Sequence, residues 1–285
     1  MKPLPVIATV VDSYGHFFRH VGTFVRIGWL WLLVMATLSW IVPELTGPEP
    51  SGSEIPQMPG VGTFLFILPL YILMGFLWSA IAVAWHRHIL LGEQPAGPIG
   101  APLNGTVVRF FVASVLYFIG FYVVLFLAML PAGAIAMMTQ GGSPAGGALA
   151  MLIVSVLAVT ACLLYLRFSL IFPAIAIGRR DFGLRDAWQH ARGNSWRIFF
   201  MWFLGLLPLI VVNLIWLWAW STALFSTVGG DCGFGNTACM EEAMTGGRFM
   251  ATNFVANALL SLLYYAVSIG FLSFAYRRLV EEANA

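Results

Sequence analysis

Six long apolar runs divide this chain of 285 residues, and they constrain its fold more than any motif does. The runs lie at about residues 24–41, 61–85, 107–130, 148–166, 198–220 and 249–276. Each is close to the ~20 residues with which an α-helix crosses a hydrocarbon layer about 30 Å thick. We therefore predict an all-α integral membrane protein of six transmembrane helices, forming one polytopic domain over residues 1–285.

Composition excludes the main classes of soluble protein. Hydrophobic residues make up 60% of the chain and charged residues only 9%, so charge cannot cover the surface of a globule. Nucleic-acid binding requires a concentrated basic face with aromatic or groove-reading modules, and the sequence contains neither. The expected partners are membrane lipids and not nucleic acid.

The placement of Lys and Arg predicts the orientation of the spans, because these residues are retained on the cytoplasmic side. If the N-terminus is inside, all 14 Lys and Arg residues except Arg248 fall on the cytoplasmic side. The outer loops carry acidic residues instead, namely Glu44, Glu49, Glu54, Asp231, Glu241 and Glu242. We predict a multi-pass protein of the bacterial cytoplasmic (inner) membrane with both termini in the cytoplasm.

The six spans are expected to form three helical hairpins with amphipathic segments at the membrane interface. Residues 6–20 have the polar and apolar faces typical of such a helix. Residues 168–178 are apolar but contain Pro173, so we expect them to turn along the inner interface. The pattern Asp-x-aromatic-x-His at residues 12–16 recurs at residues 186–190, which indicates an internal repeat. Ordinary placement of arginine beside aromatic residues explains the same layout, and both interpretations stay open.

One basic segment lies between the fourth and fifth apolar runs. It contains Arg179, Arg180, Arg185, Arg192 and Arg197. Clustered cationic residues at a membrane surface attract anionic lipid, so we expect this segment to contact lipid headgroups or a protein partner. The alternative is that these arginines only hold the loop on the cytoplasmic side.

A polar stripe follows one face of the sixth run. Its members recur at helical spacing and are Asn253, Asn257, Ser261, Tyr264 and Ser268. In hydrocarbon such a face must meet another helix or a wet cavity, and Asn213 in the fifth run is the expected partner. Hydrogen bonds between helices are the first interpretation, and a pocket for a small solute is the second.

Histidine spacing raises the question of a metal site. Asp12, His16 and His20 are four residues apart and share one face of a helix, a geometry that can hold zinc or iron. We favour the polar face of an interfacial helix, with Asp12 supporting His16, because no Cys or Glu nearby completes a site. His86 and His88 point different ways on a helix and are interpreted as interfacial charges at the end of the second run.

The cysteines agree with the predicted topology. Cys232 and Cys239 share an outer loop, where an oxidising periplasm predicts a disulfide bond, while Cys162 is a small residue within an apolar run. No Ser/His/Asp order, P-loop, GxGxxG or CxxC pair is present, and no paired acid and base can be named at membrane depth. We therefore expect no enzymatic activity and no cofactor.

A family resemblance rests on motifs around the fourth and fifth runs. These are Arg-Phe-Ser-Leu-Ile-Phe-Pro-Ala at residues 167–174, Leu-x-x-Ala-Trp at residues 184–188 and Asn-x-Trp-Arg-Ile at residues 194–198. They resemble the bacterial polytopic membrane domain found with some glycerophosphodiester phosphodiesterases and related six-span membrane proteins. In that family a separate soluble barrel with metal ligands looks to carry the hydrolysis. The sequence contains no such barrel, so the resemblance implies the membrane architecture and not the activity.

Two functions are compatible with these features. The first is a membrane scaffold or accessory protein whose basic cytoplasmic face contacts anionic lipid or a partner protein. The alternative is a carrier or channel for a neutral or lipidic solute that uses the polar stripe of the sixth span. The absence of charge deep in the spans lowers the expectation of an ion-coupled carrier.

Overall fold

The computed structural model describes residues 3–46, 61–95, 100–138, 144–231 and 247–282, and over these residues it contains helices and no strands. The prediction of an all-α chain is confirmed. In chain order the elements are α1 (Val6–Arg19), α2 (Val21–Thr46), α3 (Val61–Leu91), α4 (Gly105–Met138), α5 (Pro144–Tyr165), η1 (Leu166–Leu170), α6 (Ile171–Ala176), α7 (Leu184–Ala191), α8 (Ser195–Asp231), α10 (Gly247–Tyr276) and η2 (Arg277–Glu281).

Five helical stretches are long and apolar enough to cross a membrane. They are Leu68–Leu91, Gly105–Pro131, Met151–Ala176, Ser195–Ala223 and Val255–Glu281. The first predicted span lies in α2, which qualifies only together with α1, and these two helices are bent by 77° at the break between them. The described residues therefore contain five such stretches, or six if α1 and α2 together count as one.

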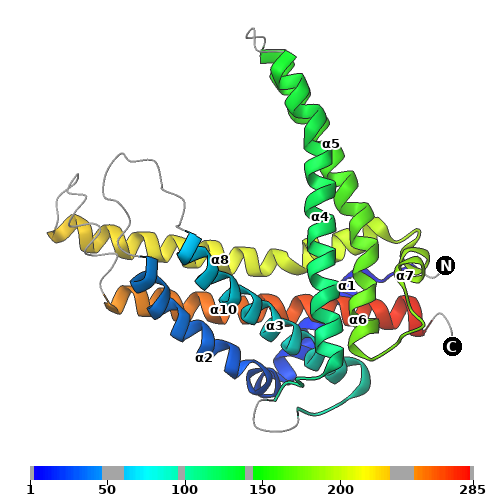
Figure 1. Cartoon of the computed structure of the whole chain (residues 1–285), viewed down its shortest axis with the longest axis horizontal. Coiled ribbons are helices and arrows are strands. Elements are labelled where there is room, and N and C mark those ends of the chain that lie inside the picture. The colour runs from blue at the N-terminus through cyan, green and yellow to red at the C-terminus, as the bar shows by residue number, and fades with distance from the viewer. Residues whose placement is uncertain (1–2, 47–60, 96–99, 139–143, 232–246, 283–285) are drawn as a thin grey trace.

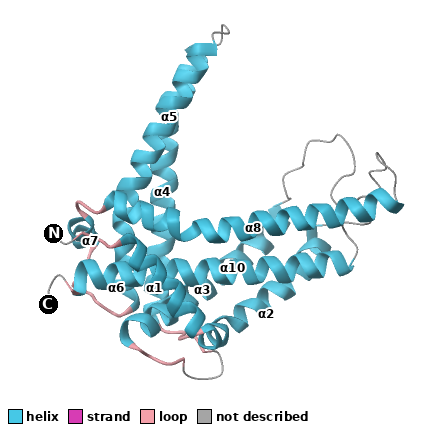
Figure 2. Cartoon of the chain, turned by 180° about the vertical axis from the view of Figure 1, so that it is seen from behind, coloured by secondary structure: helices cyan, strands magenta, loops and turns pink. Residues whose placement is uncertain are grey.

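The long helices form one bundle with a hairpin projecting from it (Figure 1). Helix α10 contacts α3 and α8, and α2 packs on α3. Helices α4 and α5 lie along each other and stand crosswise to α8 and α10, as both views show (Figure 2). Few of their side chains are buried, so their apolar surfaces are compatible with lipid as solvent.

The segment after the fourth predicted span does not turn along the interface. The 3-10 turn η1 follows α5 directly, and α6 continues the helical path through Pro173 to Ala176. Proline is tolerated there because it occupies the first turn of α6, where its missing N–H removes no interior hydrogen bond. The expectation for residues 168–178 was therefore wrong, and the fourth apolar stretch is longer than predicted.

Arginine side chains tie the basic ends of several helices together. Arg87 at the end of α3 donates to the Ala176 carbonyl at the end of α6 over 3.3 Å. Arg277 of η2 donates to the Ile89 carbonyl near the end of α3. These bonds join segments that are far apart in the sequence, so the ends that carry them lie at the same end of the bundle.

Helix α1 docks on the bundle through a face of mixed polarity, and Phe17 is buried there. Thr9 and Ser13 are buried, and Ser13 lies where a Cβ on Gly270 of α10 would approach it to 3.1 Å. On the opposite side Ile7 and Val11 are 74% and 61% exposed. The predicted amphipathic helix is therefore present, with apolar residues on both sides. Phe17 is buried against the protein, whereas Ile7 and Val11 face outward, where they suit a membrane interface.

Candidate functional site

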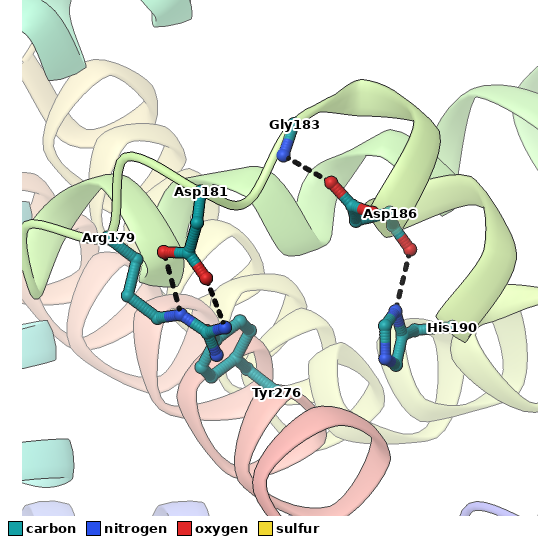
Figure 3. A network of polar contacts seen from close by, with 6 residues as sticks. All are labelled: Arg179, Asp181, Gly183, Asp186, His190 and Tyr276. Carbon is teal, nitrogen blue, oxygen red and sulfur yellow. Dashed lines mark hydrogen bonds and ion pairs between the residues drawn. The ribbon is translucent and has the colours of Figure 1, made fainter. Parts of the chain in front are cut away.

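The basic segment begins with a side-chain network at the end of α10 (Figure 3). The Arg179 guanidinium pairs with the Asp181 carboxylate at 2.8 Å and donates to the Tyr276 hydroxyl at 3.1 Å. Its hydrogen bond holds the pKa of the Asp181 carboxyl below its usual range. Arg179 is therefore used to attach the loop before α7 to α10.

The same loop is shaped by a cap at the start of α7. The Asp186 carboxylate accepts the Gly183 N–H at 2.8 Å, which satisfies a free donor at the N-terminus of the helix. His190 Nδ1 donates to the Asp186 carbonyl one turn earlier, also at 2.8 Å (Figure 3). Helix α7 thus lies directly before α8, as α1 lies directly before α2. The two aspartates of the repeated pattern differ in their partners, because Asp186 accepts from Gly183 and Asp12 pairs with Arg278.

Further polar groups fix the start of α8. Arg167 donates to the Ser195 hydroxyl at 2.5 Å and its guanidinium lies 4.3 Å from the centre of the Trp188 ring. Arg197 donates to the Leu4 carbonyl at 3.1 Å, and the Leu4 N–H donates to the Asn194 side chain at 2.9 Å. Several residues of the motifs noted in the sequence therefore have structural roles.

The remaining arginines of the basic segment point outward. Arg180, Arg185 and Arg192 are exposed, and none forms an ion pair with a described residue. Two apolar residues of the same segment, Leu184 and Trp196, are also 56% and 55% exposed. The structure thus divides the five predicted contact residues into two that bond to other parts of the fold, Arg179 and the exposed Arg197, and three exposed arginines that form no ion pair with a described residue.

Part of the predicted polar stripe faces a cavity. Asn257 and Ser261 of α10 line an open, mostly apolar space of about 510 Å³ between α2, α3 and α10. The remaining lining residues are Trp31, Met35, Tyr71, Met74, Gly75, Trp78 and Ala258. Two residues of the predicted stripe therefore border a cavity, and its use by a solute stays a prediction.

Other members of the stripe do not join this cavity. Asn213 lies half-buried on α8 and is not among the described residues that line it, so the expected pairing with Asn257 does not form the pocket. Tyr264 of α10 packs half-buried against the hydrophobic core and is not among the described residues that line the cavity. Asn253 belongs to α10, but its side chain lies outside the described residues.

The interpretation of His86 and His88 as interfacial charges was wrong. They point different ways, as expected, but are only 1% and 5% exposed. His86 Nδ1 bonds to the Ser273 hydroxyl of α10 at 2.7 Å. His88 Nδ1 lies 2.8 Å from the Glu93 carbonyl, and its ring meets those of His16 and His20.

The structure also changes the predicted histidine set. Asp12 does not support His16, because its carboxylate pairs with Arg278 of η2 at 2.5 Å. Instead His16, His20 and His88 offer one ring nitrogen each within 4.8 Å of one another, and we call these three residues the histidine cluster. Burial and the charges of His20 and His88 lower the pKa of His16 to about 4. No spacing in the sequence connects His88 to the other two, so sequence reasoning missed it.

Two further predictions have limited outcomes. Cys232 and Cys239 lie outside the described residues, and their disulfide stays a prediction. Cys162 is half-buried in α5 with a free thiol. Comparisons with family models, with curated proteins and with solved structures find no match for this chain.

Proposed function

We propose that this chain is a multi-pass protein of the bacterial cytoplasmic membrane and acts as a scaffold or accessory protein without catalytic activity. Its arginine-rich end, built from α7 and the start of α8, docks on anionic lipid headgroups. The apolar helices support the membrane setting, since their exposed surfaces suit lipid and not water. The resemblance to the membrane domain of phosphodiesterases adds the same architecture as an expectation.

One observation carries the lipid contact: Arg180, Arg185 and Arg192 are exposed and not neutralised by a described acidic side chain. Arginines needed for folding form internal bonds, as Arg179 and Arg197 do. Exposed Trp196 beside the outward arginines has the amphipathic ring typical of the headgroup level. Charge and aromatic surface together favour a lipid headgroup layer over a purely aqueous face.

The experiment measures lipid retention by the purified full chain. We expect native mass spectrometry to show bound phosphatidylglycerol, and the triple variant Arg180→Gln, Arg185→Gln, Arg192→Gln to lose it. Each arginine contributes about 1 kcal/mol to attraction by anionic lipid, so three correspond to roughly a hundredfold weaker binding. The control removes the same charge elsewhere, at Arg19, Arg26 and Arg109, which are also exposed.

The outcomes separate the explanations. Loss of lipid in the first triple variant alone supports the proposal. Equal loss in both variants indicates that only total charge matters. Unchanged lipid retention, with loss of a co-purifying protein, assigns the face to a protein partner.

A second candidate function follows from the cavity between α2, α3 and α10. Its tryptophan and methionine walls, with polar groups from Asn257 and Ser261, suit a neutral or lipidic solute. A carrier or channel for such a solute requires this space to be open. We expect Ser261→Phe to fill it and to abolish crosslinking of a photoactivatable diacylglycerol, and Asn257→Ala to change solute flux into vesicles. No change in either variant contradicts this function.

A further inference from the structure

We propose that the histidine cluster is a binding site for a divalent transition metal ion, with zinc as the best fit. The site lies where the C-terminal end of α1 meets the C-terminal end of α3. Ring centroids of His16 and His20 are 4.3 Å apart, and that of His88 lies 5.3 and 5.0 Å from them. His16 of α1 and His20, which directly follows α1, thus meet His88 of α3.

Hydrogen bonding decides which nitrogen each ring presents. His20 Nδ1 lies 2.9 Å from the His16 carbonyl, and His88 Nδ1 lies 2.8 Å from the Glu93 carbonyl. A carbonyl only accepts, so both Nδ1 atoms carry the proton and both Nε2 atoms keep a free lone pair. Metal-ligating histidines are oriented in this way by a hydrogen bond from the other ring nitrogen.

Two ring nitrogens of the cluster lack any other partner. The Nε2 atoms of His16 and His88 are buried and form no hydrogen bond with a described residue. Buried polar atoms are nearly always paired, and an unpaired one costs the desolvation of its lone pair. A cation held between the rings satisfies both atoms at once.

Local structure brings the third ligand into place. Gly92 has φ of +70° and its N–H donates to the His88 carbonyl, which ends α3 with a left-handed residue. The chain then turns back so that the Glu93 carbonyl accepts from His88. Trp85 stacks on His88 at 5.2 Å and is itself anchored by a 3.0 Å bond to the Ala266 carbonyl of α10.

The ligand set selects the type of metal. Three neutral imidazoles suit zinc, copper, nickel or iron, whereas magnesium and calcium prefer oxygen ligands. Tetrahedral zinc has Zn–N distances of about 2.0 Å, which places the ligand nitrogens about 3.3 Å apart. The three nitrogens already lie within 4.8 Å of one another, so binding needs them to approach by at most about 1.5 Å.

The charges around the cluster determine the fourth ligand. Arg19 directly precedes His20, and the Arg277 guanidinium lies over the ring of Phe274, which contacts His16. The carboxylates of Asp12 and Glu93 are paired with Arg278 and Arg87. A divalent ion on three neutral ligands beside two cations favours an anion, such as hydroxide or a phosphate oxygen, in the open position.

Zinc binding to the purified full chain, with any affinity tag removed, tests the site. We expect competition with a chromophoric chelator to give one Zn²⁺ per chain, and His20→Ala and His88→Ala to weaken it at least about a hundredfold, beyond the loss of a supporting hydrogen bond. The matched control is His190→Ala, because His190 Nδ1 also donates to a carbonyl one turn earlier but lies outside the cluster. The affinity of the His190→Ala variant for Zn²⁺ is expected to equal that of the wild type.

A second measurement guards against misfolding. Co²⁺ is expected to give the visible absorption of tetrahedral coordination in the wild type and in His190→Ala, and to lose it in His20→Ala. His20 is half-buried, so its substitution perturbs packing less than that of His88. Wild-type protein without stoichiometric zinc, equal binding by His20→Ala, or equal loss in His190→Ala would each overturn the proposal.

Discussion

Arg278 and Asp12 join the two ends of the described chain, with Nη2 of Arg278 2.5 Å from Oδ2 of Asp12. The same guanidinium donates to the hydroxyl of buried Thr9. Through this arginine η2 holds α1 against α10, and α1 carries His16 and is directly followed by His20 of the histidine cluster. An ion pair that sequence reasoning did not predict therefore positions the N-terminal helix.

Substitution of Arg278 tests this attachment. Arg278→Ala is expected to lower the free energy of unfolding by about 1–3 kcal/mol, because a charged donor to Asp12 and Thr9 is lost. Asp12→Asn is expected to cost less than about 1 kcal/mol, since Asp12 is 46% exposed. Thermal unfolding in detergent and hydrogen exchange of α1 measure both effects. Arg19→Ala is the control, because its Nε bonds only within α1, and an equal loss there contradicts the assignment.

Close packing of α8 on α10 gives a second prediction. A Cβ on Gly205 would lie 2.1 Å from the ring of buried Phe271, so Gly205→Ala is expected to destabilise the chain by about 1–3 kcal/mol. Gly22→Ala in α2 meets nothing within 4 Å and is expected to be neutral or stabilising. The added change Phe271→Leu should recover part of the loss. If Gly205→Ala unfolds at the same temperature as the wild type, α8 and α10 make room for the added methyl group and the prediction is contradicted.

The Arg87–Glu93 pair predicts an acid-dependent loss of stability. Arg87 hydrogen bonds to the Glu93 carboxylate at 2.6 and 2.7 Å and lowers its pKa below the ordinary 4.5. The folded state therefore stabilises the ionised form of the Glu93 carboxyl relative to its protonated form. The contribution of this ion pair to the free energy of unfolding is complete above about pH 4.5. It is lost as the pH falls through the pKa of Glu93 in the folded state.

The size of this effect is limited because Glu93 is 47% exposed, so we expect at most about 1 kcal/mol. Glu93→Gln should flatten the fall in unfolding temperature measured from about pH 7 to about pH 3. Glu282→Gln serves as the control, because Glu282 is exposed and forms no ion pair with the described part of the chain. If both variants follow the wild-type curve, the pair does not contribute.

The sequence was sufficient to predict the long helices, because a membrane-spanning helix needs a certain length and an apolar composition. It was insufficient where segments distant along the chain meet. Residues 6–20 were recognised as amphipathic, but the face that packs on the protein combines Ser13, which meets Gly270 of α10, with Phe17, and the sequence did not show this. His88 could not be joined to His16 by spacing, since the contact depends on how α1 docks on α10 and α8. The cavity at Asn257 likewise depends on residues from two other helices.

Membrane orientation is the last prediction. Arginine placement predicts that the end carrying α7 faces the cytoplasm. Leu184 is 56% exposed at that end, so Leu184→Cys in a chain lacking the native cysteines is a suitable reporter. An impermeant maleimide is expected to label it only after cells are permeabilised. Cys232 and Cys239, retained in a Cys162→Ala chain and reduced, are expected to react in intact cells. Labelling of Leu184→Cys in intact cells would reverse the orientation and remove the cytoplasmic assignment of the basic face, because α7 and the outward arginines belong to one short segment.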